Sequence, residues 1–203
     1  MALSPGSTLA DYLVPARVTR SNTLLRDGIL VVGFSIFLAL CAQVSFYIPF
    51  TPVPITLQTL AVVLTGAALG SKRGGLAMLL YLAEGAAGLP VFAGGAGGFI
   101  HLIGYTGGYL WSYPIAAFVT GLLCEKRLDR SFQTSILAML PATVIIYAVG
   151  VPWLAVVLHL TFAQALVAGM VPFIPGDLLK LVVATALLPT AWAIVGKVRP
   201  RAM

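Results

Sequence analysis

Two opposite charges stand three residues apart at the start of the last long apolar stretch of the chain. Asp177 and Lys180 precede the run 181–195, which contains no charged residue. Residues at positions i and i+3 share one face of a helix, so we expect the two side chains to lie together. Asp177 could cap the helix while Lys180 extends toward lipid headgroups. Alternatively, the two form a charged pair that lines a cavity, because ionisable groups within a membrane are costly and usually functional.

Further polar side chains interrupt other apolar stretches. Glu84 is the only acidic residue well inside an apolar run, and it either pairs with a neighbouring helix or lines the same cavity. Thr56 and Gln58 stand where another apolar run begins, and they either make capping and interhelical hydrogen bonds or contact a ligand. Tyr109 belongs to an aromatic cluster that could form a membrane-interface belt or a stacking surface.

These residues lie in a chain with the composition of an integral membrane protein. Of its 203 residues, 60% are hydrophobic and 9% are charged, and the mean hydropathy is +1.01. Several stretches of about twenty residues carry almost no charge, which is the length that a helix needs to cross a bilayer. The net charge of +6 does not indicate nucleic-acid binding, because the basic residues fall between apolar runs and form no recognition motif. They are distributed instead as positive-inside signals.

We predict an all-α integral membrane protein with a bundle of six transmembrane helices and both termini in the cytoplasm. Residues 1–26 are expected to form a mobile cytoplasmic N-terminal arm, and residues 27–203 a single membrane domain. Proline, glycine and basic residues mark the ends of the helices. The expected helices cover about 29–48, 57–69, 75–89, 104–124, 132–150 and 177–195.

The segment 152–171 is apolar enough to be a seventh crossing, but the distribution of charge argues against it. Two basic loops and both basic ends of the chain reach the cytoplasmic side together only with an even number of crossings. We therefore expect 152–171 to be a re-entrant or interfacial extension of the fifth helix. The loops 49–56, 90–103 and 151–176 then share the outer face. Irregular backbone at membrane depth is tolerated where it lines a cavity, so we expect a cavity in the outer half.

The sequence offers little support for catalysis. It contains no Gly-x-Ser-x-Gly elbow and no His-Glu-x-x-His motif. Cys41 and Cys124 have no neighbours at the spacing of a zinc site or a disulfide framework. We expect no enzymatic activity, no metal and no cofactor; a membrane-embedded enzyme would need a second acid or base beside Glu84 or Asp177. No ATP-binding motif is visible, so any pumping must be energised by a partner or an ion gradient.

Four motifs in order along the chain resemble the BioY family, the biotin-specific substrate-capture (S) components of energy-coupling-factor (ECF) vitamin transporters. They are Thr51–Thr59, Tyr81–Gly95, Gly104–Tyr109 and Pro172–Lys180, and the resemblance covers roughly residues 30–196. It implies a six-helix bundle in the plasma membrane that binds biotin from outside, with the loops between helices 1–2 and 3–4 as lids. It also implies a transmembrane coupling protein and two ATPase subunits as partners, whereas some members act alone or as oligomers.

The resemblance also assigns contacts with biotin. Asp177 and Lys180 match polar ligand contacts in the last helix of the family, and Gly94, Gly95 and the stretch 52–58 match its lid regions. The full set that we expect to bind substrate is Asp177, Lys180, Glu84, Gln58, Thr56, Tyr81, Gly94, Gly95 and Tyr109. The ureido group of biotin has two N–H donors and a carbonyl acceptor, which a carboxylate and an ammonium group can match. The alternative is a transporter subunit of the same architecture for another vitamin or small metabolite.

Overall fold

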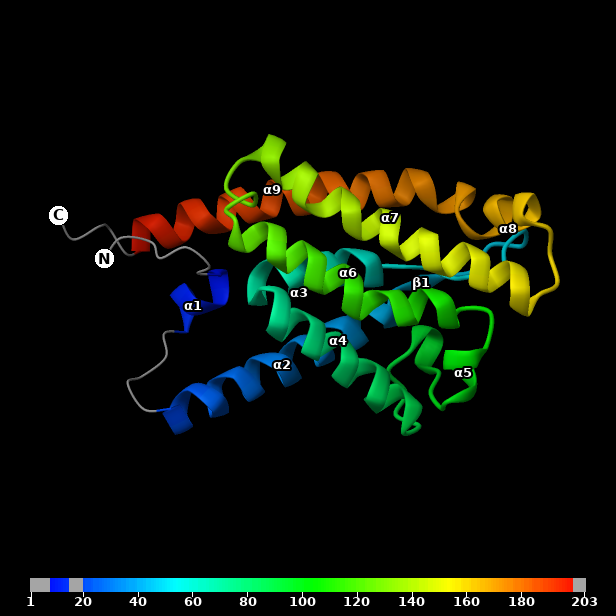
Figure 1. Cartoon of the computed structure of the whole chain (residues 1–203), viewed down its shortest axis with the longest axis horizontal. Coiled ribbons are helices and arrows are strands. Elements are labelled where there is room, and N and C mark those ends of the chain that lie inside the picture. The colour runs from blue at the N-terminus through cyan, green and yellow to red at the C-terminus, as the bar shows by residue number, and fades with distance from the viewer. Residues whose placement is uncertain (1–7, 15–19, 199–203) are drawn as a thin grey trace.

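The long helices of the chain lie side by side in one bundle (Figure 1). This computed structural model describes residues 8–14 and 20–198, with side chains described for 8–14 and 22–195. In that part the longest helices are α2 (Arg20–Gln43), α3 (Gln58–Leu69), α4 (Ser71–Ala86), α6 (Gly107–Glu125), α7 (Phe132–Val157) and α9 (Ile174–Val198). The shorter helical elements are α1 (Leu9–Leu13), η1 (Ala93–Gly95), α5 (Ile100–Ile103), α8 (Phe162–Gly169) and η2 (Val171–Phe173). A small antiparallel hairpin pairs β1 (Ser45–Phe46) with β2 (Ile55–Thr56).

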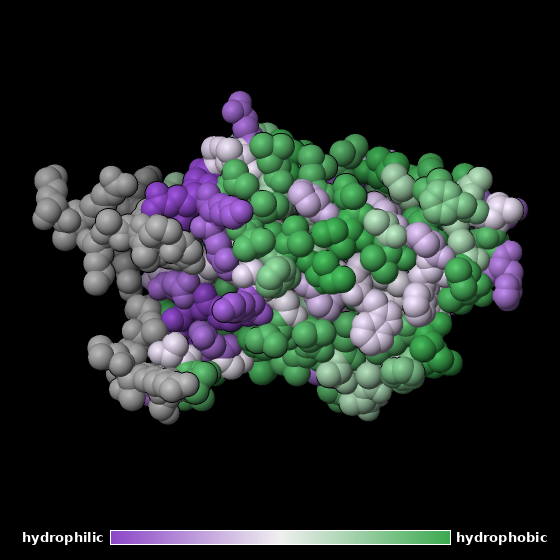
Figure 2. Space-filling model, viewed as in Figure 1, coloured by the Kyte–Doolittle hydropathy of each residue, from purple (hydrophilic) through white to green (hydrophobic). Residues whose placement is uncertain are grey.

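Large apolar side chains cover the outside of the bundle. Val144 is 63% exposed and Leu179 is 66% exposed, and Figure 2 shows an apolar surface along the helices. Three helical stretches in the described part are long and apolar enough to cross a membrane: Asn22–Gln43, Phe132–Val157 and Phe162–Val195. An apolar exterior of this extent is solvated by lipid, so the chain is a membrane protein.

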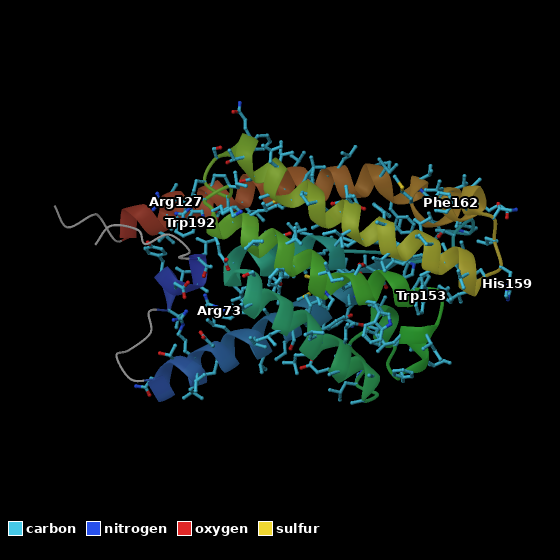
Figure 3. All side chains as sticks on the ribbon, viewed as in Figure 1. Arg73, Arg127, Trp153, His159, Phe162 and Trp192 are labelled. Carbon is cyan, nitrogen blue, oxygen red and sulfur yellow. The ribbon has the colours of Figure 1, made fainter. Side chains whose placement is uncertain are left out.

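The two ends of the bundle differ in chemistry. Hydrophilic residues gather at the end where α1 lies (Figure 2), and Arg73, Arg127 and Trp192 mark this end in Figure 3. We call it the basic end. The opposite end, marked by His159 and Phe162 in Figure 3, holds the β-hairpin, α5 and α8; we call it the loop end.

Small residues allow α3 to approach α6 closely. A Cβ atom on Gly66 would lie 2.3 Å from the backbone oxygen of Ala117, so only glycine fits there. Gly70 follows α3 with a φ of +84°, a conformation that favours glycine. The side chain of Glu125 then accepts hydrogen bonds from the backbone N–H of Ser71 at 2.7 Å and from its hydroxyl at 2.9 Å. This carboxylate caps the start of α4 and joins it to the end of α6.

The helix boundaries depart from the sequence expectation mainly in the segment 152–171. Helix α7 runs past residue 150 and through Pro152 to Val157. The chain then turns at His159, whose φ is +52°, and α8 starts afresh with Thr161 as its cap: the Thr161 hydroxyl accepts from the Gln164 amide at 3.3 Å. The segment is therefore the end of one helix, a turn and a separate short helix. Pro141 and Pro152 both lie inside α7. Each removes only one backbone donor, and the apolar residues around them continue the helix.

Other boundaries also move. Helix α2 begins at Arg20 and stops at Gln43, rather than spanning 29–48, because the chain enters the hairpin at β1. Helix α9 begins at Ile174, so the Pro-Gly pair before Asp177 forms part of its first turn, where proline is tolerated. The expected N-terminal arm is partly folded, since α1 and the start of α2 fall within residues 1–26; residues 1–7 and 15–19 lie outside the described residues.

Candidate functional site

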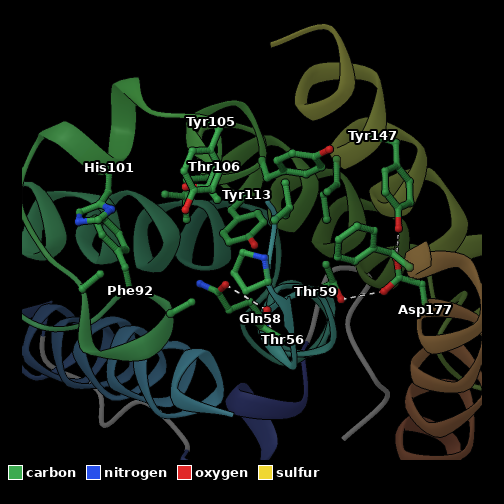
Figure 4. Close-up of a pocket in the computed structure, with 18 of the residues that line it drawn as sticks. Thr56, Gln58, Thr59, Phe92, His101, Tyr105, Thr106, Tyr113, Tyr147 and Asp177 are labelled. Atoms are coloured by element: carbon green, nitrogen blue, oxygen red, sulfur yellow. Dashed lines mark hydrogen bonds between the residues drawn. The ribbon is translucent and has the colours of Figure 1, made fainter. Parts of the chain in front are cut away.

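The loop end contains a cavity between α3, α6, α7 and α9, covered by the hairpin segment and by the segment that carries η1 (Figure 4). Its volume is about 120 Å³, below the roughly 300–1,000 Å³ of ordinary small-molecule pockets. A vitamin-sized ligand therefore requires the covering segments to move. The lining residues are Tyr47, Val53, Pro54, Thr56, Gln58, Thr59, Phe92, Ala93, Ala96, His101, Tyr105, Thr106, Tyr109, Leu110, Tyr113, Ile146, Tyr147, Phe173, Asp177 and Lys180.

An ion pair forms one end of the cavity. Lys180 Nζ lies 2.9 Å from Asp177 Oδ1, and the two side chains are only 13% and 11% exposed. The hydroxyl of Thr59 on α3 donates to the same Asp177 oxygen at 3.2 Å and accepts from Lys180 at 3.0 Å. The phenol of Tyr147 on α7 donates to the other carboxylate oxygen. Asp177 thus joins α3, α7 and α9, and Figure 4 shows its hydrogen bonds with Thr59 and Tyr147. The predicted pairing of Asp177 with Lys180 is present.

A chain of hydrogen bonds runs from the cavity wall to the covering segment. The hydroxyl of Thr56 donates to Gln58 Oε1 at 3.1 Å and accepts from the Gln58 amide at 3.2 Å. Gln58 Nε2 donates to the Tyr81 hydroxyl at 2.6 Å, and that hydroxyl donates to the backbone oxygen of Val91 at 3.0 Å. Tyr81 is fully buried. Thr56 and Gln58 therefore line the cavity, whereas Tyr81 stands behind them and holds the segment after α4.

The segment that carries η1 is joined to the end of α2. Gln43, at the end of α2, donates to the backbone oxygen of Phe92 at 3.2 Å. Phe92 is only 3% exposed. Its ring meets the ring of Tyr81 edge to face, with centroids 5.5 Å apart. Gly94 and Gly95 take φ values of +68° and +73°. Neither glycine lines the cavity; their neighbours on each side do.

Tyr109 lines the cavity with its ring, but its hydroxyl is already used. It donates to the backbone oxygen of Gly169 at 2.8 Å, which ties α6 to α8. Tyr105 and Tyr113 also line the cavity, so this part of the aromatic cluster contributes to the cavity wall. Trp111 is 41% exposed and does not line the cavity, as expected of a residue at a membrane interface.

Glu84 does not line this cavity. It lies on α4 and accepts a hydrogen bond at 3.1 Å from the hydroxyl of Ser35 on α2. Of the two roles that the sequence allowed, pairing with a neighbouring helix or lining the cavity, Glu84 therefore has the first. Ser35 is fully buried and also donates to the backbone oxygen of Val32 at 2.9 Å.

The structure adds residues that the predicted set lacks. Tyr147 reaches Asp177 from α7, Thr59 completes the ion-pair cluster, and His101 and Phe92 form the opposite end of the cavity in Figure 4. Tyr147 is a single tyrosine within a long apolar run, and nothing else in the sequence marks it as a residue of the site. A lone phenol in such a run indicates a polar partner inside the bundle.

A second, apolar groove of about 520 Å³ lies between α7, α8 and α9. Val144, Phe162 and Leu178, all of which are exposed, line it together with other apolar residues. Tyr147 and Asp177 form part of its wall, so the same two side chains separate the groove from the cavity.

Almost the whole chain matches one protein family. The model of the BioY family matches residues 14–197. The chain belongs to the BioY family. The matched range contains every residue that lines the cavity, so the ion-pair cluster of this BioY chain lies within the part shared with the family. Helix α1 lies outside the match.

Curated relatives of this BioY chain are similar over most of their length. The "Biotin transporter BioY" of Thermotoga maritima is 44% identical over 161 residues, 79% of this chain and 90% of the relative. The protein of the same name from Rhodobacter capsulatus is 42% identical over 187 residues, 85% of this chain and 96% of the relative. A solved structure, the S-component for biotin from an ECF-type ABC transporter, matches with a TM-score of 0.76 at 27% identity. That match covers 85% of this chain and 94% of the other.

Proposed function

We propose that this BioY-family chain is the substrate-binding membrane subunit of a biotin transporter, which captures biotin in the cavity at the loop end. The buried ion pair of Asp177 and Lys180 supports this function most directly. This carboxylate and this ammonium, held by Thr59 and Tyr147, offer an acceptor and a donor side by side in a pocket whose wall is otherwise mostly aromatic and aliphatic, with a few uncharged polar side chains.

The chemistry of biotin fits this arrangement. Its ureido N–H groups can donate to the free lone pairs of Asp177, and its ureido oxygen can accept from Lys180. Its fused ring and alkyl chain are apolar and suit the wall formed by Phe92, Tyr113 and Ile146. Its carboxylate needs backbone amides or a cation, and the covering segment with Gly94 and Gly95 can turn amides toward it as it closes.

The direction of capture follows from charge. The basic end carries Arg73, Arg127 and Arg130, and arginine-rich ends of membrane helices lie on the cytoplasmic side. In the proposed arrangement six helices cross the plasma membrane, both termini are cytoplasmic, and the cavity opens to the outside. The covering segments then act as lids over biotin.

Direct titration tests the ligand. We expect purified chain in lipid nanodiscs to bind biotin saturably at one site per chain, with thiamine and riboflavin giving no saturable signal at the same concentrations. Isothermal calorimetry or binding of labelled vitamins measures this. Tighter binding of another vitamin would assign the cavity to that ligand and overturn the proposal.

We further propose that uptake depends on an ECF coupling protein and ATPase subunits, because the sequence contains no ATP-binding motif of its own. Cells that lack biotin uptake should accumulate labelled biotin when this chain is expressed with those subunits. Equal uptake by the chain expressed alone would contradict the dependence and favour a self-sufficient carrier or oligomer.

A further inference from the structure

Asp177 lies where three spaces in the bundle meet. It forms part of the wall of the ligand cavity and part of the wall of the apolar groove between α7, α8 and α9. It also lines a further small cavity of about 20 Å³ where α3, α7 and α9 meet. The orientation of its carboxylate therefore decides whether a ligand in the cavity can use its acceptor sites.

The partners of Asp177 divide between its two oxygens. Lys180 and Thr59 both donate to Oδ1, at 2.9 and 3.2 Å. The phenol of Tyr147 donates to Oδ2, and it is the one hydrogen-bond partner of that oxygen among the side chains that the structure describes. A carboxylate offers about four acceptor sites, two on each oxygen. The site that remains open to a ligand therefore lies on the oxygen that Tyr147 holds.

Tyr147 borders the apolar groove as well as the cavity. Tyr147 and Asp177 line both spaces, whereas Lys180 and Thr59 line the cavity but not the groove. Apart from Thr143, the rest of the groove wall is apolar. A carboxylate oxygen without a partner beside such a wall is costly, because hydrocarbon supplies no donor. The phenol therefore provides a hydrogen bond to Oδ2 that the groove itself does not.

Lys180 is the alternative partner for Oδ2. Its ammonium group has three donors, and it stands at position i+3 from Asp177 on the same helix. Without the phenol, Lys180 could contact both carboxylate oxygens. Each charge would then be satisfied by the other and would offer less to a ligand. The hydrogen bond from Tyr147 keeps Oδ2 apart from the ammonium, so that an acceptor and a donor remain side by side.

The phenol comes from a packed part of the bundle. Tyr147 lies within α7 (Phe132–Val157), which contacts both α6 and α9. Its neighbour Ile146 is only 2% exposed. Thr59 holds the carboxylate from α3, and Figure 4 shows both hydrogen bonds meeting at Asp177. Neither partner belongs to the covering segments that must move for a ligand to enter, so the carboxylate can keep its orientation while they move.

We propose that Tyr147 is a positioning residue for ligand recognition: its hydrogen bond to Oδ2 holds the Asp177 carboxylate apart from Lys180 and leaves an acceptor site for the ligand. The arrangement fits a ligand group in which an N–H donor stands beside a carbonyl oxygen, as on one edge of a cyclic urea. That the ligand is biotin rests on the proposed function, whereas the effect of Tyr147 on the carboxylate does not.

Infrared spectroscopy tests the positioning without any ligand. The difference between the spectra of the unmodified chain and of Asp177→Asn contains the carboxylate bands of Asp177. Tyr147→Phe keeps the ring in the wall and removes only the hydroxyl. We expect it to shift these bands, measured against the double variant with Asp177→Asn, because carboxylate stretching depends on the hydrogen bonds of the two oxygens. Tyr147→Phe should also bind biotin about tenfold more weakly, since a hydrogen bond to a charged group is lost.

Tyr109→Phe is the matched control for the bands. Tyr109 also lines the cavity, but its hydroxyl donates to the backbone oxygen of Gly169 at 2.8 Å and not to Asp177. Its loss should leave the Asp177 bands in place. Unshifted bands in Tyr147→Phe, or an equal shift in both variants, overturn the positioning role. If Tyr147→Phe does not purify as a folded protein, fluorotyrosine at position 147 takes its place, because it keeps the shape of the phenol and changes the strength of its hydrogen bond.

The two proposals fail separately. Absence of biotin binding by the unmodified chain overturns the proposed function and leaves the infrared bands to decide whether Tyr147 orients Asp177. Normal biotin binding by the unmodified chain together with unshifted bands in Tyr147→Phe overturns the positioning role alone. Shifted bands with an unchanged affinity for biotin also overturn it, because Tyr147 would then orient a carboxylate that the ligand does not use.

Discussion

Replacing Asp177 by asparagine should lower the affinity for biotin by roughly ten- to a hundredfold. Hydrogen bonds to a charged group contribute about 1.5–3 kcal/mol each, and about 1.4 kcal/mol changes affinity tenfold. The substitution removes the charge that holds Lys180 and Tyr147 in place and replaces an acceptor oxygen by an amide donor. Titration of the purified variant in nanodiscs measures the change, with the circular dichroism spectrum as a check that the helices are retained.

Glu84→Gln is the matched control for this result. It makes the same carboxylate-to-amide change within an apolar helix, but Glu84 contacts Ser35 and lies outside the cavity. Its affinity for biotin should stay within about twofold of the unmodified chain. An equal loss of affinity in both variants would mean that Asp177 acts through general stability and does not contact the ligand.

Gly66→Ala should destabilise the bundle, with a fall of several degrees in the midpoint of thermal unfolding. The added methyl group would lie 2.3 Å from a backbone oxygen of α6, which no rotamer change relieves. Overpacking of this kind typically costs about 1–3 kcal/mol, and backbone atoms yield less readily than side chains. Size-exclusion profiles of heated samples give the midpoint.

Gly33→Ala provides the comparison. A Cβ atom on Gly33 of α2 meets no atom within 4 Å, and alanine is the better helix former by about 1 kcal/mol. This variant should unfold at the same temperature as the unmodified chain or higher. If both glycine variants lose stability equally, the close approach of α3 to α6 is not what requires Gly66.

The sequence predicts the helical bundle well because the apolar runs correspond to the long helices and the breaks between them to the connecting segments. Asp177 with Lys180, and Thr56 with Gln58, could be placed at one site because each pair stands at the start of an apolar run on the same side of the predicted membrane. Hydropathy could not divide 152–171, because apolar residues continue through the break; only the cap at Thr161 and the turn at His159 mark it.

Two other features depend on contacts that no local pattern specifies. Glu84 has the depth of a cavity residue, but the rotation of α4 about its axis turns it toward Ser35. Tyr147 looks like any aromatic residue of an apolar helix until α9 is placed beside α7. The folding of α1 likewise depends on arginines far along the chain, Arg26 and Arg73, so its five residues looked like part of a mobile arm.

A structure of the chain with biotin bound tests the central claim most directly. We predict that the ureido group lies within hydrogen-bonding distance of Asp177 and Lys180 in the cavity between α3, α6, α7 and α9, beneath the two covering segments. Biotin in the apolar groove between α7, α8 and α9, on the other side of Asp177 and Tyr147, would contradict the claim.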